Sequence, residues 1–418
     1  MMTVLLTNGY VVTMDAARAI HDPGFVLIDD AGRIAATGPM ADCPAVPETP
    51  AIDCADKIVL PGLIDLYQRH WTHLLPASAP AEAIAARMDV AEHAIAAGLA
   101  GEALVSGGVT TVLNAAPDLA IEAQGAVAAA FDAAGLRAVH AVPQDRTSSM
   151  AGAIWVDTDM PARMTGRATD ASITAAVQAA RTLGWRIVTR LWPDGATAEE
   201  MTAARRKLGR SAVQHLMEMG VLDDRWIVVS PIGLDDTDRQ LLRESGCHVV
   251  DLPVAEAAAG TSALDITALS KLGVNLGLGT DGPGRTGSCD MIEQMKYLLM
   301  TQNTMSLDPT SMSMEQVLEM ATINAARALG LDGEIGSLEA GKRADIAVFD
   351  LGVPHSAVTA KPLSGFIACV RASEAELVLR DGRVIFRKSE IGMPRPSLEP
   401  ALAARRAVMA RITKPVAA

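Results

Sequence analysis

The sequence predicts an α/β protein: a (β/α)8 TIM barrel with a small β-sandwich domain that is formed from both ends of the chain. The middle of the chain alternates between helical and strand patterns, for example a helix at 121–134 before a strand at 137–142 and a helix at 198–219 before a strand at 226–229. Such alternation is typical of parallel βαβ units. Most of eight such units can be recognised, over a length that is usual for this barrel.

The two ends of the chain instead share the pattern of a β-hairpin. Residues 24–29 form a strand pattern that turns at an Asp-Ala-Gly step, and residues 377–386 contain two strand patterns joined by Asp381-Gly382. Turns of the Asx-Gly type favour antiparallel pairing. We therefore expect one composite β domain and one barrel inserted into it, with boundaries at 1–57 plus 343–418 for the β domain and 58–342 for the barrel.

A helix pattern follows the last barrel strand. Residues 314–329 have the periodicity of one amphipathic helix. Ser313 is the expected N-cap, and Gln316 lies three residues later, which completes a capping box.

Composition excludes several classes of function. The 418 residues carry a net charge of −13, and only 3% of them are aromatic, which argues against nucleic-acid and membrane partners. No apolar run approaches the roughly 20 residues that a membrane span needs, and we see no signal-peptide pattern at the start. The five cysteines are an odd number without Cys-x-x-Cys spacing. We therefore expect a cytoplasmic protein that acts on a small molecule.

The most informative stretch is residues 59–70. An apolar run closes with Pro61-Gly62, continues through Leu-Ile-Asp65, and ends in polar, reactive side chains. This stretch resembles the Pro-Gly-hydrophobic-Ile-Asp-x-His-x-His signature of the amidohydrolase superfamily, in its cytosine-deaminase and chlorohydrolase-like branch. The segments Gly-Thr-Asp-Gly at 279–282 and 321–350 resemble the same family. The resemblance also implies the barrel with its composite β domain, and a homo-oligomer, most often a dimer.

The positions at which this family binds a metal ion are occupied differently here. The first-strand His pair falls on Tyr67 and Arg69, and the fifth-strand ligand falls on Arg190, or on Thr189 if the register shifts by one residue. The sixth-strand histidines are lost, and that segment begins at Ser230; the seventh-strand His-Asn-Pro becomes Asp251-Leu-Pro, and only Asp281 matches the family pattern. An arginine side chain has no lone pair to donate to a metal at any workable pH. We therefore expect no metal and no other cofactor.

The resemblance and the side chains together predict a site at the ends of the barrel strands. Arginines suit a carboxylate or an oxyanion, and a nearby cation favours an ionised Asp281. The hypothesis is a metal-independent hydrolase of a small, anionic cyclic amide, lactone or similar compound. In it, Asp281 is the general base and the arginines polarise the carbonyl group. A lyase or isomerase at the same site, or a catalytically inactive ligand-binding or scaffold subunit in which Asp281 only forms a buried salt bridge with Arg190, is the alternative. The expected catalytic residues are Asp281, Arg190, Arg69 and Tyr67, and the expected substrate-binding residues are His70, Trp192, Ser230, Asp251, Asp145 and Arg285.

Overall fold

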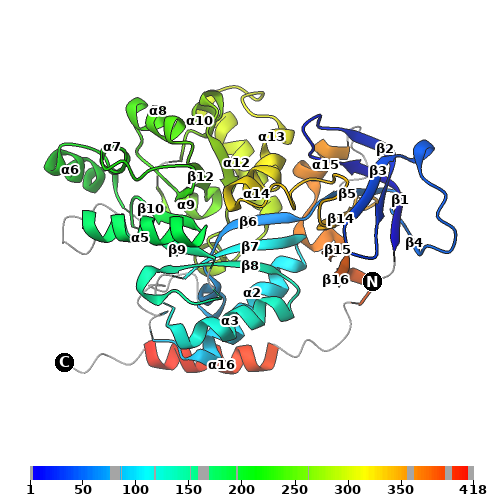
Figure 1. Ribbon diagram of the computed structural model, residues 1–418, viewed down its shortest axis with the longest axis horizontal. Coiled ribbons are helices and arrows are strands. Elements are labelled where there is room, and N and C mark those ends of the chain that lie inside the picture. Colours follow the sequence, from blue (N-terminus) through cyan, green and yellow to red (C-terminus); the bar gives the residue numbers. More distant parts are fainter. Residues whose placement is uncertain are drawn as a thin grey trace.

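A computed structural model describes residues 3–75, 85, 87–116, 119–150, 152–158, 169–193, 196–261, 263–354, 362–390 and 398–412. It confirms the predicted barrel (Figure 1). Eight parallel strands follow one another around the sheet, and the first and last also lie close together, so that the barrel is nearly closed. In chain order these strands are β6 (Leu63–Gln68), β7 (Val109–Ala115), β8 (Arg137–Pro143), β9 (Ala153–Trp155), β10 (Arg186–Arg190), β11 (Trp226–Val229), β12 (His248–Asp251) and β13 (Asn275–Leu278).

Helices cover the outside of the barrel (Figure 1). Buried apolar side chains on these helices pack against the strands in one large core. The helices that follow barrel strands include α2 (Val90–Val105), α3 (Ile121–Ala133), α5 (Asp170–Leu183), α6 (Ala198–Leu208), α7 (Ala212–Glu218), α8 (Asp236–Ser245), α9 (Pro253–Ala259), α10 (Ile266–Leu272), α11 (Pro283–Thr286), α12 (Met291–Ser306), α13 (Met314–Met320) and α14 (Ile323–Leu329). We find no helix among the described residues that has the length and apolar character to cross a membrane.

Two helices that the sequence predicts as continuous are each divided in two. The predicted helix at 198–219 ends at Gly209, which is in the left-handed conformation, and restarts at the N-cap Ser211. Glycine adopts this conformation without strain, and a new N-cap then satisfies the free backbone N–H groups of the next helix. The predicted helix at 314–329 also breaks, between α13 and α14. Its predicted capping box between Ser313 and Gln316 is confirmed.

The two chain ends meet in a second sheet, which has the strand order β16-β15-β14-β5-β1-β2-β3, with β4 paired to β1 (Figure 1). Its strands are β1 (Val4–Val12), β2 (Ile20–Ile28), β3 (Ile34–Pro39), β4 (Ala51–Asp53), β5 (Lys57–Pro61), β14 (Ile346–Asp350), β15 (Ala375–Arg380) and β16 (Arg383–Arg387). Helix α15 (Pro362–Cys369) contacts β5, α12 and α13, whereas α16 (Leu398–Ile412) packs on α2 of the barrel. Part of the C-terminal segment therefore lies against the barrel.

The Pro61-Gly62 step carries the chain from one sheet into the other. Strand β5 pairs with β14 up to Pro61, and the barrel strand β6 begins at Leu63. A Cβ atom at Gly62 would lie only 2.3 Å from Oγ1 of Thr110, so that the close approach of the two strands requires glycine here. This step places the end of β6, and the polar residues after it, at the mouth of the barrel.

Candidate functional site

The predicted site residues stand where barrel strands end. Arg190 and Asp251 are the last residues of β10 and β12, Ser230 directly follows β11, and Arg69 and Asp281 come shortly after β6 and β13. Because the strands are parallel, all of these residues reach the same, C-terminal face of the barrel, where enzymes of this fold bind their substrates.

Asp65 holds the first and last strands together beneath this face. Its carboxylate accepts hydrogen bonds from the backbone N–H groups of Tyr67 and Thr280 and from the Thr280 hydroxyl. Burial raises the pKa of Asp65 to about 7, although the bond from the Thr280 hydroxyl opposes this rise. The backbone N–H of Asp281 also donates to the carbonyl oxygen of Tyr67, at 2.8 Å. These bonds position Asp281 relative to β6.

A buried ion pair joins the ends of β6 and β13. Nη2 of Arg69 lies 2.6 Å from Oδ2 of Asp281, and the two side chains are only 5% and 3% exposed. The guanidinium group is a permanent cation, so it favours the ionised form of the aspartate. This ion pair gives Asp281 a cationic partner on the neighbouring strand end.

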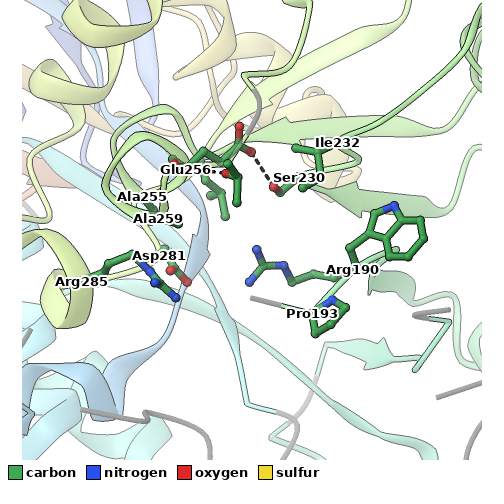
Figure 2. Close-up of a pocket in the computed structure, with 12 residues that line it drawn as sticks. Arg190, Pro193, Ser230, Ile232, Ala255, Glu256, Ala259, Asp281 and Arg285 are labelled. Carbon is green, nitrogen blue, oxygen red and sulfur yellow. Dashed lines mark hydrogen bonds between the residues drawn. The ribbon is translucent and has the colours of Figure 1, made fainter. Parts of the chain in front are cut away.

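A cavity of about 360 Å³, including its opening to solvent, lies beside this ion pair. Figure 2 shows the Arg190 guanidinium pointing into the cavity from one side, with Asp281 and Arg285 on the facing side. The described residues that line the cavity come from the ends of strands β10 to β13 and from the segments after them: Arg190, Trp192, Pro193, Ser230, Ile232, Leu252, Ala255, Glu256, Ala259, Thr261, Asp281 and Arg285. Five predicted site residues, Arg190, Trp192, Ser230, Asp281 and Arg285, are thus brought together.

Glu256 is the cavity residue that the sequence analysis missed. It lies in the first turn of α9, is 5% exposed, and accepts a hydrogen bond of 2.5 Å from Oγ of Ser230 (Figure 2). An acidic residue in the first turn of a helix usually complements the helix dipole at the surface, so the sequence pattern alone did not single it out. The available signal was its position one turn after the seventh strand, which puts it at the barrel mouth.

Glu256 and Asp251 form a pair of buried carboxyl groups. Burial raises the pKa of Glu256 to about 7, against the hydrogen bond from Ser230 and the charge of Arg190, which lower it. Burial and the neighbouring Glu256 raise the pKa of Asp251 well above its usual range. Oδ1 of Asp251 is buried without a hydrogen-bond partner among the described residues. Burial therefore favours the protonated forms of both groups.

Tyr67 supports the cavity from behind. Its ring is buried, Cζ of Arg190 lies 5.6 Å from the ring centroid, and the ring of Trp155 lies 6.3 Å away on a tilted plane. A guanidinium group at this distance over an aromatic ring is attracted by the ring electrons. Tyr67 thus contacts the cavity through Arg190, in the same way as Arg69 contacts it through Asp281.

Two predicted substrate-binding residues lie elsewhere. His70 is fully buried; its Nδ1 donates to Oδ1 of Asn114, and its Nε2 lies 3.0 Å from Nδ1 of His93. Burial lowers the pKa of His70 well below its usual value. Asp145 is exposed and lines a separate cavity of about 790 Å³, a volume that includes its opening to solvent, with Trp155 and other residues.

The side chains at the strand ends include arginines where the family pattern has metal ligands. Among the described residues, no group of three or more His, Cys, Asp or Glu side chains could hold a metal ion. The guanidinium group of Arg69, which cannot act as a ligand, already contacts the carboxylate of Asp281. Zinc centres are usually held by imidazole, thiolate and carboxylate ligands.

Comparisons with known proteins place this geometry in context. The sequence profile of the amidohydrolase family matches residues 58–385. A 5-methylthioadenosine/S-adenosylhomocysteine deaminase from Syntrophobacter fumaroxidans is 31% identical and covers 91% of this chain and 92% of its own length. An S-triazine hydrolase from Gordonia rubripertincta is 25% identical, over 96% of this chain and 94% of its own.

Solved structures resemble the whole chain. An adenosine deaminase from Xanthomonas campestris with bound zinc superimposes with a TM-score of 0.83 at 22% identity, over 98% of both chains. A mutant atrazine chlorohydrolase from Arthrobacter aurescens, in complex with zinc and atraton, also reaches 0.83, at 19% identity over 97% of this chain and 100% of that one. At these identities the similarity bears on the fold alone.

Proposed function

The chain belongs to the amidohydrolase family, and from this premise we propose that it is a hydrolase that works without the family's metal ion. Its substrate is a small anion with a cyclic amide, lactone or similar bond. The observation that carries the proposal is the buried ion pair between Arg69 and Asp281, in which a fixed cation contacts the aspartate that matches the family pattern.

The charges around the cavity support an anionic substrate. The charges of Arg69 and Asp281 offset each other, and burial favours the protonated forms of Glu256 and Asp251. Two guanidinium groups, those of Arg190 and Arg285, line the cavity itself. Guanidinium groups bind carboxylates and oxyanions through paired N–H donors, so the cavity favours a ligand of this kind.

The proposed chemistry assigns one role to each charged group. Asp281 takes a proton from the attacking water, and Arg190 stabilises the oxyanion that develops on the substrate carbonyl. Arg69 holds Asp281 in position and ionised. Removing a preorganised donor of this kind typically costs about 3–4 kcal/mol in the transition state.

One relative is named as a deaminase and another as a hydrolase, and both names describe hydrolytic reactions. These names favour hydrolysis over the lyase or isomerase alternative. The turnover experiment described below also tests the inactive-subunit alternative. An inactive ligand-binding or scaffold subunit would hydrolyse no ligand that it binds, and Asp281→Asn would then change binding or stability alone.

The first test is metal content. Elemental analysis of the protein after mild purification should find less than one equivalent of zinc, iron or manganese per chain. One full equivalent of a single transition metal at the barrel mouth would refute the proposal.

The second test is turnover. Thermal-shift screening of small carboxylates, lactones and cyclic amides identifies a ligand, and hydrolysis of that ligand is then measured. Asp281→Asn should abolish turnover with binding largely retained, whereas Arg190→Met should weaken both and Arg190→Lys should rescue poorly. Asp345→Asn is the matched control, because Asp345 is also a buried partner of an arginine, Arg137, but at the opposite end of the barrel. Full turnover in Asp281→Asn would show that the base is misassigned.

A further inference from the structure

Ser230 carries a hydroxyl group that is both buried and directed into the cavity. Its Oγ donates to Oε1 of Glu256, and both residues line the cavity beside Arg190 (Figure 2). We propose that Ser230 is a nucleophile with Glu256 as its general base, so that hydrolysis passes through a covalent ester of Ser230. This inference rests on the proposed hydrolase function and adds an intermediate to it.

The backbone at Ser230 holds the hydroxyl in place. Ser230 has a φ of 49°, in the left-handed region that a serine adopts only at a cost. Its backbone N–H donates to the carbonyl of Val250, and its own carbonyl accepts from the N–H of Ile232, at 2.8 Å in both cases. The second bond closes a tight turn around Pro231, whose ring suits the central position of an inverse γ-turn. A rigid turn at the end of a strand can hold a nucleophilic side chain in a fixed position.

A second serine shows what an ordinary buried serine–carboxylate contact looks like in this chain. Oγ of Ser211 donates to Oδ1 of Asp238, and both side chains are buried. Ser211 is also the N-cap of α7 and accepts from the backbone N–H of Gln214. Its hydroxyl therefore has a structural role. Ser230 is the N-cap of none of the described helices, and its carboxylate partner lines the cavity beside Arg190.

The proposed reaction balances in two halves for an amide or ester substrate. In the first, Oγ of Ser230 bonds to the carbonyl carbon and gives its proton to Glu256. The bond to the leaving group then breaks, and Glu256 passes that proton to the leaving atom. Arg190 faces the oxyanion that forms in between.

In the second half, water attacks the ester and gives one proton to Asp281, which releases it to solvent. The ester bond breaks, and the second proton of that water returns to Oγ through Glu256. The product leaves as a carboxylate.

An alkyl fluorophosphonate tests this without a known substrate, since it phosphonylates activated serines with loss of fluoride. Intact-mass and peptide mass spectrometry of the full chain should find one adduct per chain, on Ser230. Ser230→Ala should remove that adduct. Glu256→Gln should slow labelling by about 100-fold, the usual contribution of a general base. Ser211→Ala is the matched control and should label within twofold of the wild-type rate.

The pH dependence gives a readout that needs no variant. Because the pKa of Glu256 is raised to about 7, the wild-type labelling rate should rise as pH increases through 7 and then level off. Three results would each overturn the inference. The first is a labelling rate that does not change between pH 6 and pH 8, and the second is the absence of an adduct on Ser230. The third is an unchanged labelling rate in a folded Glu256→Gln variant.

The failure of this inference is separable from failure of the proposed function. If a confirmed substrate is hydrolysed at the wild-type rate by Ser230→Ala but not by Asp281→Asn, the hydrolase stands and the covalent intermediate is excluded. If Asp281→Asn hydrolyses that substrate fully, the base assignment of the proposed function is wrong, whatever the labelling of Ser230.

Discussion

Removal of one partner of the Arg69–Asp281 ion pair should destabilise the protein strongly. Charges 2.6 Å apart attract by about 6 kcal/mol at an effective dielectric constant of about 20, and the desolvation of both groups offsets much of this. Arg69→Met leaves the buried carboxylate without this cation. We therefore expect it to lower the free energy of unfolding by about 3–5 kcal/mol.

A double-mutant cycle measures the coupling. Arg69→Met and Asp281→Asn together should cost less than the sum of the single changes, with a coupling energy of about 2–3 kcal/mol. Equilibrium urea unfolding at pH 7, followed by tryptophan fluorescence, supplies the free energies. Arg181→Met is the control, because the Arg181–Asp223 pair is 45% and 27% exposed and should contribute at most about 1 kcal/mol. Additive single effects, or a loss of under about 1 kcal/mol in Arg69→Met, would refute this reasoning.

Three further predictions follow from other features. Folding raises the pKa of Glu256 and Asp65 to about 7, so the folded chain binds protons that the unfolded chain has released. The free energy of unfolding should therefore fall from pH 5.5 to 7.5, by up to about 1.4 kcal/mol per pH unit and group, and Glu256→Gln should flatten this slope. A rise over that range contradicts the prediction. Gly282→Ala should lower the melting temperature more than Gly287→Ala: both have a φ near 75°, but only at Gly282 would the new Cβ meet Oγ1 of Thr72, at 2.3 Å. Equal losses would show that the site absorbs the clash. Finally, we expect a homodimer, and light scattering at micromolar concentration should give twice 43.7 kDa; a single monomer mass would count against it.

The barrel could be predicted because its strands alternate with helices at a regular spacing, and because residues 59–70 resemble a known family. Strand β9 has only three residues, which is too short for a periodic pattern to identify. The breaks after Leu208 and Met320 escaped prediction for a related reason: hydrophobic periodicity continues across them, and only the local capping residues mark the stop.

The site was predictable to the extent that it consists of strand-end residues. Arg190, Ser230 and Asp281 stand directly at or after strands, and they meet around one cavity. The position of a loop residue in the sequence does not determine the direction in which its side chain points. His70 begins a short helical turn that directs it inward to Asn114, and Asp145 is exposed in a short turn after β8. Glu256 belongs to a helix, and only the packing of α9 against the mouth brings it to Ser230.

The unfavourable features of this chain argue that the mouth of the barrel is more than a scaffold. Ser230 and Asp281 both have left-handed backbones, and a non-glycine residue in such a conformation costs about 1–3 kcal/mol. Asp251 and Glu256 are both buried, Glu256 raises the pKa of Asp251, and one oxygen of Asp251 lacks a hydrogen-bond partner among the described residues. A structural role would be better served by apolar side chains of similar volume, which often replace buried charges without loss of stability. Such costs gathered around one cavity are expected where strain and charge serve binding or chemistry.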